Sequence, residues 1–161
     1  MEFIGRIYCF FESLFGQQLG EYLWGYNCET GDYTNPALFS RIALWTLSIS
    51  LVIGVLYYYI INSSRFHRWW SWLIMLFSNS LLCFFFAYWW IIEDFKNNLI
   101  GDCLLYQRDE AGTIIESYIT DSSFWGFSLA NAIISLFLFF MLSMLLKWRS
   151  VNSVSYTHLR A

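Results

Sequence analysis

The chain has 161 residues, of which 58% are hydrophobic, 22% aromatic and 13% charged, and its formal net charge is -3. Soluble domains carry about 25% charged residues, so this composition excludes an ordinary soluble fold. The mildly negative charge offers no basic surface for phosphates, so nucleic acid is not an expected partner.

The first 24 residues, "MEFIGRIYCFFESLFGQQLGEYLW", have the pattern of an amphipathic helix. As a transmembrane helix they would bury Arg6 and Glu12, each costing about 2.5–3.5 kcal/mol near the bilayer centre. As a cleaved signal peptide they lack a basic start and a small-residue cleavage site. We therefore expect residues 1–41 to form an interfacial helix and a loop. The apolar face of that helix would consist of Phe3, Ile4, Ile7, Phe11, Leu14 and Phe15.

Three apolar runs follow, at residues 42–61, 70–92 and 124–146, and none contains a charged residue. A hydrocarbon core about 30 Å thick needs about 20 helical residues. Strands of a membrane barrel would be about 10 residues long and would alternate apolar with polar residues, which these runs do not. The sequence therefore predicts an all-α membrane protein with three transmembrane helices.

The charges of the connecting segments predict the orientation. Residues 62–69 contain Arg65 and Arg68 and no acid, and residues 147–153 contain Lys147 and Arg149 and no acid. In contrast, residues 93–123 carry seven acidic and two basic residues. Short loops rich in Lys and Arg remain in the cytoplasm. We therefore expect the link and the C-terminal segment to be cytoplasmic and the acidic segments to be extracytoplasmic.

The acidic loop contains two β-prone runs, residues 103–107 and 113–119, on either side of "RDEAG". This pattern predicts a small β-hairpin, which needs support because an isolated hairpin is marginally stable in water. Cys28 and Cys103 fall in the same predicted compartment. They can form a disulfide or remain two unpaired thiols, because a shared compartment does not fix their distance.

Asn79 and Asn131 are amides within otherwise apolar predicted spans. An unpaired amide in lipid is costly, so each should face another helix and form hydrogen bonds there. At 1.5 Å per residue, Asn131 lies about 6 Å closer to the outer surface than Asn79. Direct pairing therefore needs helix tilt, and Ser80, Ser128 or a neighbouring subunit are alternative partners.

Pairs of small residues four positions apart also occur in the predicted spans. Ser50 with Gly54, and Gly126 with Ala130, allow close approach of helices. The approach could be within one bundle or between copies of the chain. We interpret these pairs and the asparagines as packing contacts, with an ion pathway as the alternative.

No motif for catalysis, dinucleotide binding or phosphate binding is present in the sequence, and no metal or cofactor is expected. The favoured function is a non-catalytic subunit or scaffold of a membrane assembly. It would contact the lipid bilayer and either other membrane proteins or further copies of itself. The alternatives are a homo-oligomeric pore and, third, the membrane anchor of an enzyme whose catalytic part lies beyond the given sequence.

The final residues, "VSYTHLRA" at 154–161, show no structural pattern. Back-translated, they resemble one reading frame of the transposase mosaic-end adapter used in sequencing libraries. We therefore expect them to be adapter read-through from a shotgun or metagenomic assembly, and we exclude them from the fold prediction. On this interpretation the natural chain differs after residue 153.

Overall fold

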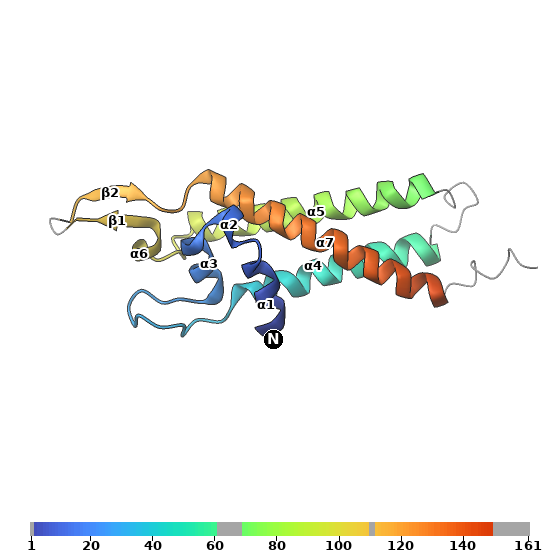
Figure 1. Ribbon diagram of the computed structural model, residues 1–161, viewed down its shortest axis with the longest axis horizontal. Helices are drawn as coiled ribbons and strands as arrows, with labels where there is room; N and C mark the ends of the chain where they lie inside the picture. The colour runs from blue at the N-terminus through green and yellow to red at the C-terminus, as the bar shows by residue number, and fades with distance from the viewer. Residues whose placement is uncertain (1, 61–68, 110–111, 150–161) are drawn as a thin grey trace, which may run out of the picture.

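The computed structural model describes residues 2–60, 69–109 and 112–149, and it is mostly helical (Figure 1). Arg65, Arg68 and the predicted read-through at 154–161 lie outside the described residues. Among those described, three helices are long and apolar enough to cross a membrane: Leu38–Tyr59, Trp70–Lys96 and Asp121–Lys147. The prediction of three such helices is confirmed.

These three helices form an elongated stem. Helix α4 (Leu38–Val55) continues into a π-helical turn, η1 (Leu56–Ile60), and runs beside α5 (Trp69–Lys96) and α7 (Asp121–Arg149) (Figure 1). Helix α7 packs against both α5 and α4, which contact each other less. The helices extend beyond the apolar runs because polar residues fit their ends. Asp121 lies in the first turn of α7 and Lys96 in the last turn of α5, where each charge complements the helix dipole.

The stem is apolar outside and partly polar inside. Its exposed side chains include large hydrophobic ones on all three helices, such as Trp45, Phe77 and Phe137, which are 54%, 63% and 65% exposed. Its buried polar side chains are Thr46, Ser50, Asn79, Ser80, Ser128, Asn131, Ser135 and Ser143. Polar contacts between helices under an apolar surface are typical of proteins embedded in lipid. The distribution therefore supports membrane embedding.

The remaining described residues, 2–37, 97–109 and 112–120, form a cap at one end of the stem. In place of one N-terminal helix there are three short ones: α1 (Glu2–Cys9), α2 (Glu12–Phe15) and α3 (Gln17–Trp24). The prediction of a single amphipathic helix is wrong. Gly16 separates α2 from α3 with φ 87° and ψ 153°, a conformation that favours glycine.

The break changes which side chains of the N-terminal segment are buried. Tyr8 and Phe15 are 0% and 1% exposed, whereas Ile7, Phe10 and Leu14 are exposed. The short helices pack against both α4 and α7. They therefore bury side chains in several directions, which a single flat helical face cannot do.

The second part of the cap contains α6 (Asp102–Leu105), β1 (Tyr106–Arg108) and β2 (Ile114–Ser117). The strands pair antiparallel, so the predicted hairpin is confirmed, but its first strand begins at residue 106 rather than 103. Leu104 and Leu105 are both buried. Consecutive residues of a strand point to opposite faces, so a short helix buries this pair more readily. The hairpin projects from the end of the cap (Figure 1).

Candidate functional site

Asn131 joins four helices through one buried amide. Its Oδ1 accepts hydrogen bonds from Tyr8 Oη of α1, at 2.6 Å, and from Thr46 Oγ1 of α4, at 3.0 Å. Its Nδ2 donates to the backbone oxygen of Cys83 in α5, at 2.9 Å. Asn131 itself lies on α7, and all four residues are 0% exposed.

Asn79 forms the next polar layer of the stem. Its Nδ2 donates to Ser50 Oγ at 3.1 Å and to the backbone oxygen of Ser135 at 3.5 Å, which joins α5 to α4 and α7. Its Oδ1 is buried and has no hydrogen-bond partner among the described residues. The two layers therefore differ. Asn131 forms hydrogen bonds through both its Oδ1 and its Nδ2, whereas Asn79 forms them only through its Nδ2.

A third layer lies at the end of the stem away from the cap. Ser143 Oγ of α7 lies 2.5 Å from Tyr58 Oη of η1, and Trp72 Nε1 of α5 donates to it at 2.8 Å. We call the three layers together the polar seam. The polar residues follow the same spacing, four and then eight positions, in both parts of the chain. They are Thr46, Ser50 and Tyr58 in α4 and η1, and Asn131, Ser135 and Ser143 in α7. Residues four apart share a helix face, so the facing sides of α4 and α7 are polar at matching levels.

The serines that the sequence offered as alternative partners of the asparagines bond elsewhere. Ser80 Oγ donates to the backbone oxygen of Ala132 at 3.0 Å, and Ser128 Oγ to that of Phe124 at 2.7 Å. Tyr8, Thr46 and Cys83 are instead the partners of Asn131. No sequence pattern singled out Tyr8, whereas Thr46 and Ser50 could have been recognised as polar residues four apart in an apolar helix.

The small residues make contacts within the chain. A Cβ on Gly54 would lie 2.9 Å from Leu146 Cδ1 of α7. A Cβ on Gly126 would overlap the backbone carbonyl oxygen of Leu14, because α2 rests directly on α7 at this point. Ala130, one turn further along α7, is fully buried.

One disulfide joins two parts of the cap, and one hydrogen bond joins the cap to the stem. A disulfide joins Cys28, in the loop after α3, to Cys103 of α6, with a Cα–Cα distance of 6.0 Å. Tyr22 Oη of α3 donates to Asp94 Oδ2 of α5 at 3.1 Å. Burial, followed by the negative charge of Asp94, raises the pKa of the Tyr22 phenol above its usual value.

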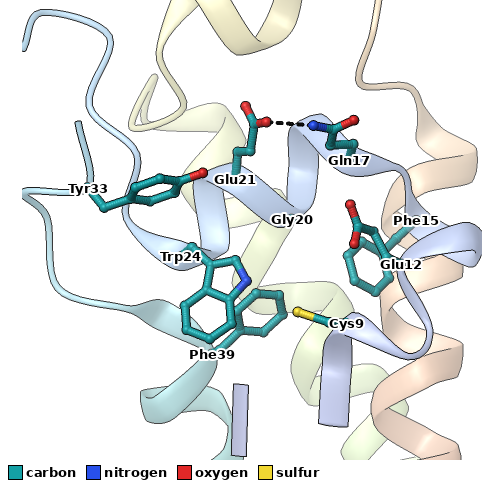
Figure 2. Close-up of a pocket in the computed structure, with 9 residues that line it drawn as sticks. All are labelled: Cys9, Glu12, Phe15, Gln17, Gly20, Glu21, Trp24, Tyr33 and Phe39. Carbon is teal, nitrogen blue, oxygen red and sulfur yellow. Dashed lines mark hydrogen bonds between the residues drawn. The ribbon is translucent and has the colours of Figure 1, made fainter. Parts of the chain in front are cut away.

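An open pocket of about 200 Å³ lies at the base of the cap (Figure 2). Helices α1 to α3, the following loop and the first turn of α4 all contribute to its wall. Along α3 at its rim, Gln17 Nε2 donates to Glu21 Oε1 at 2.9 Å. We call it the cap pocket, and its lining residues are Cys9, Glu12, Phe15, Gln17, Gly20, Glu21, Trp24, Tyr33 and Phe39.

The basic end of α7 lies away from the cap. Lys147 is exposed there, and Arg149 is the last residue of α7. Within residues 2–60, 69–109 and 112–149, no group of three or more His, Cys, Asp or Glu side chains could hold a metal ion. Comparisons with protein-family models, with curated proteins and with solved structures find no match.

Proposed function

We propose that this chain is a non-catalytic subunit or scaffold of a membrane assembly, and that it recognises its partner through the cap. The observation that carries the proposal is the contrast between the stem and the hairpin. The stem uses its asparagines and small residues for contacts within the chain, and presents apolar side chains outward. The hairpin, which projects from the cap, exposes apolar side chains.

The exposed side chains of the hairpin support a protein partner. Ile114 and Ile115 of β2 are 57% and 62% exposed, and the four residues of β2 are all exposed. A two-stranded hairpin is marginally stable alone in water. Burial of these apolar side chains by a partner would be favourable, and it would support the hairpin.

The charge distribution supports an orientation with the cap outside the cytoplasm. The cap and the segments leading into it are rich in acids, whereas Lys147 and Arg149 lie at the other end of α7. The disulfide between Cys28 and Cys103 is also suited to an oxidising compartment. A multi-pass cell-membrane protein with a cytoplasmic C-terminal segment accounts for both observations.

Site-specific photo-crosslinking in the native membrane tests the proposal. A photoreactive residue at Ile115 is expected to give one discrete protein adduct in a fixed ratio to the chain. The matched control is Ile74, 63% exposed on α5, where only lipid adducts are expected. Lipid adducts alone at both positions would contradict the proposal.

The second candidate function is a homo-oligomeric pore, and the unpartnered Oδ1 of Asn79 favours it. A buried acceptor in a polar seam can pair with water or an ion if the helices separate. This function predicts ion flux through liposomes containing the purified chain, and loss of that flux in Asn79→Leu. The absence of flux at every protein density would exclude it.

A further inference from the structure

The cap pocket has negative charge and no neutralising base. Glu12 and Glu21 both line it, and no Lys, Arg or His is among its lining residues. Neither carboxylate forms an ion pair with any described residue. The polar contact that Glu21 makes in the pocket comes from the neutral amide of Gln17.

The pocket also has aromatic walls. Figure 2 shows Trp24 and Phe39 together on one side, with Tyr33 directed toward Glu21. The Trp24 and Phe39 rings meet edge to face, with centroids 5.4 Å apart. Aromatic faces attract cations, and tryptophan does so most strongly. Carboxylates and aromatic rings around one cavity are the combination that recognises organic ammonium groups.

Electrostatics within the pocket agree with this composition. The pKa of the Tyr33 phenol is raised, first by burial and then by nearby negative groups that include Glu21 and Glu12. The two carboxylates are therefore close enough to disfavour a negative charge on Tyr33, which is 56% exposed. A cation in the pocket would offset this effect of the carboxylates on the pKa.

Size and position restrict the ligand further. A volume of about 200 Å³ is below the range of about 300–1,000 Å³ usual for drug-sized ligands, so a small group is expected. Phe39 belongs to the first turn of α4, so the pocket lies at the end of a helix long enough to span a membrane. In a bilayer spanned by that helix, phospholipid headgroups lie at this level.

We propose that the cap pocket binds a small organic ammonium group, with Glu12 and Glu21 supplying negative charge and Trp24 and Tyr33 supplying aromatic faces. The ammonium group belongs either to a phospholipid headgroup or to a free amine. This site is separate from the exposed hairpin, so it does not depend on the proposed assembly function.

Choline binding to the full chain tests the site. The protein is placed in nanodiscs of phosphatidylglycerol, which has no ammonium group, and choline binding is measured by equilibrium dialysis. We expect saturable binding, and none of the uncharged carbon isostere dimethylbutanol. Absence of saturable choline binding would overturn the proposal, as would equal binding of the isostere.

Two variants and a matched control locate the binding. Glu12→Gln combined with Glu21→Gln should weaken choline binding about ten-fold or more. Gly20→Leu should also weaken binding by filling the pocket without changing charge, because a Cβ there lies at an ordinary 3.5 Å from Phe15 Cε2. The control, Glu29→Gln combined with Glu116→Gln, removes the same charge from exposed positions elsewhere in the cap.

The control should change choline affinity by less than about two-fold. An equal loss in the control and in the pocket variants would overturn the proposal. Protection of the buried free thiol of Cys83 from a maleimide reagent verifies that each variant is folded. Two further nanodiscs with equal phosphatidylglycerol content, one diluted with phosphatidylcholine and one with a neutral galactolipid, then identify the source of the ligand at constant surface charge. Weaker choline binding in the phosphatidylcholine nanodisc indicates competition by the lipid headgroup, and equal binding indicates a free amine.

Discussion

The hydroxyl of Tyr8 donates a hydrogen bond of 2.6 Å to Oδ1 of Asn131, across 123 positions of the chain. It attaches the first helix of the cap to the last helix of the stem, and both residues are fully buried. Stacking of the Tyr8 ring with Phe127 of α7, at a centroid distance of 5.7 Å, holds the phenol in place.

Tyr8→Phe should destabilise the folded chain while preserving this ring contact. Hydrogen bonds between membrane helices contribute about 0.6 kcal/mol on average and about 1.7 kcal/mol at most. The substitution should lower the free energy of unfolding in detergent by an amount within that range. Tyr59→Phe, at a tyrosine that is 49% exposed, is the control and should leave stability unchanged. Equal stability of Tyr8→Phe and the native chain would show that the bond contributes nothing.

The two asparagines should respond differently to replacement by leucine. Asn131→Leu removes three hydrogen bonds and leaves the Tyr8 and Thr46 hydroxyls without their acceptor, so it should cost about 2 kcal/mol or more. Asn79→Leu also removes a buried oxygen that has no partner, so its cost should stay below about 1 kcal/mol. Denaturant unfolding of both variants measures the difference, and the reverse order would contradict the bonding pattern.

Gly126→Ala should displace α2 from α7. The added methyl group would overlap the Leu14 carbonyl, which belongs to the backbone and moves only with its helix. Overpacking of this kind costs about 1–3 kcal/mol. Gly54→Ala is a suitable comparison, because its methyl group would meet the mobile end of the Leu146 side chain and should cost less. Thermal unfolding of the two variants checks the order.

Thiol counting tests the link between Cys28 and Cys103. In the denatured, unreduced chain, a maleimide reagent should label the two free cysteines, Cys9 and Cys83. After reduction it should label all four cysteines of the sequence. Four labelled thiols without reduction would contradict the disulfide. For the 75-residue separation, the loop-closure estimate of its stabilising effect is about 4.5 kcal/mol. Reduction should therefore make the cap more sensitive to protease.

Alkaline pH should weaken the contact between cap and stem. The pKa of Tyr22 is raised in the folded chain by burial and by Asp94, whereas an unfolded tyrosine titrates near pH 10. The unfolded state therefore binds fewer protons above about pH 10, and stability must fall as pH rises further. Tyr22→Phe should show a smaller fall when both chains are unfolded at several alkaline pH values. Parallel curves would exclude a contribution from Tyr22.

The main architecture of the described part follows from local pattern. Uncharged apolar runs at 42–61, 70–92 and 124–146 predicted the three long helices, because bilayer thickness sets a length that composition can reveal. The β-prone runs around residue 110 likewise predicted the hairpin. The broken N-terminal segment was missed, since its helical periodicity is real but its two partners, α4 and α7, are far away in the sequence.

Residue types alone indicate that Asn79 and Asn131 need hydrogen-bond partners, because an isolated amide in lipid is costly. The identity of those partners, Tyr8 and Thr46 for Asn131, becomes visible only in the folded bundle. The same holds for the contact of Gly126 with the backbone of α2. Composition and periodicity are properties of neighbouring residues and can be read along the chain. The choice among polar partners depends on helix rotation and depth, and those are fixed only when the whole bundle packs.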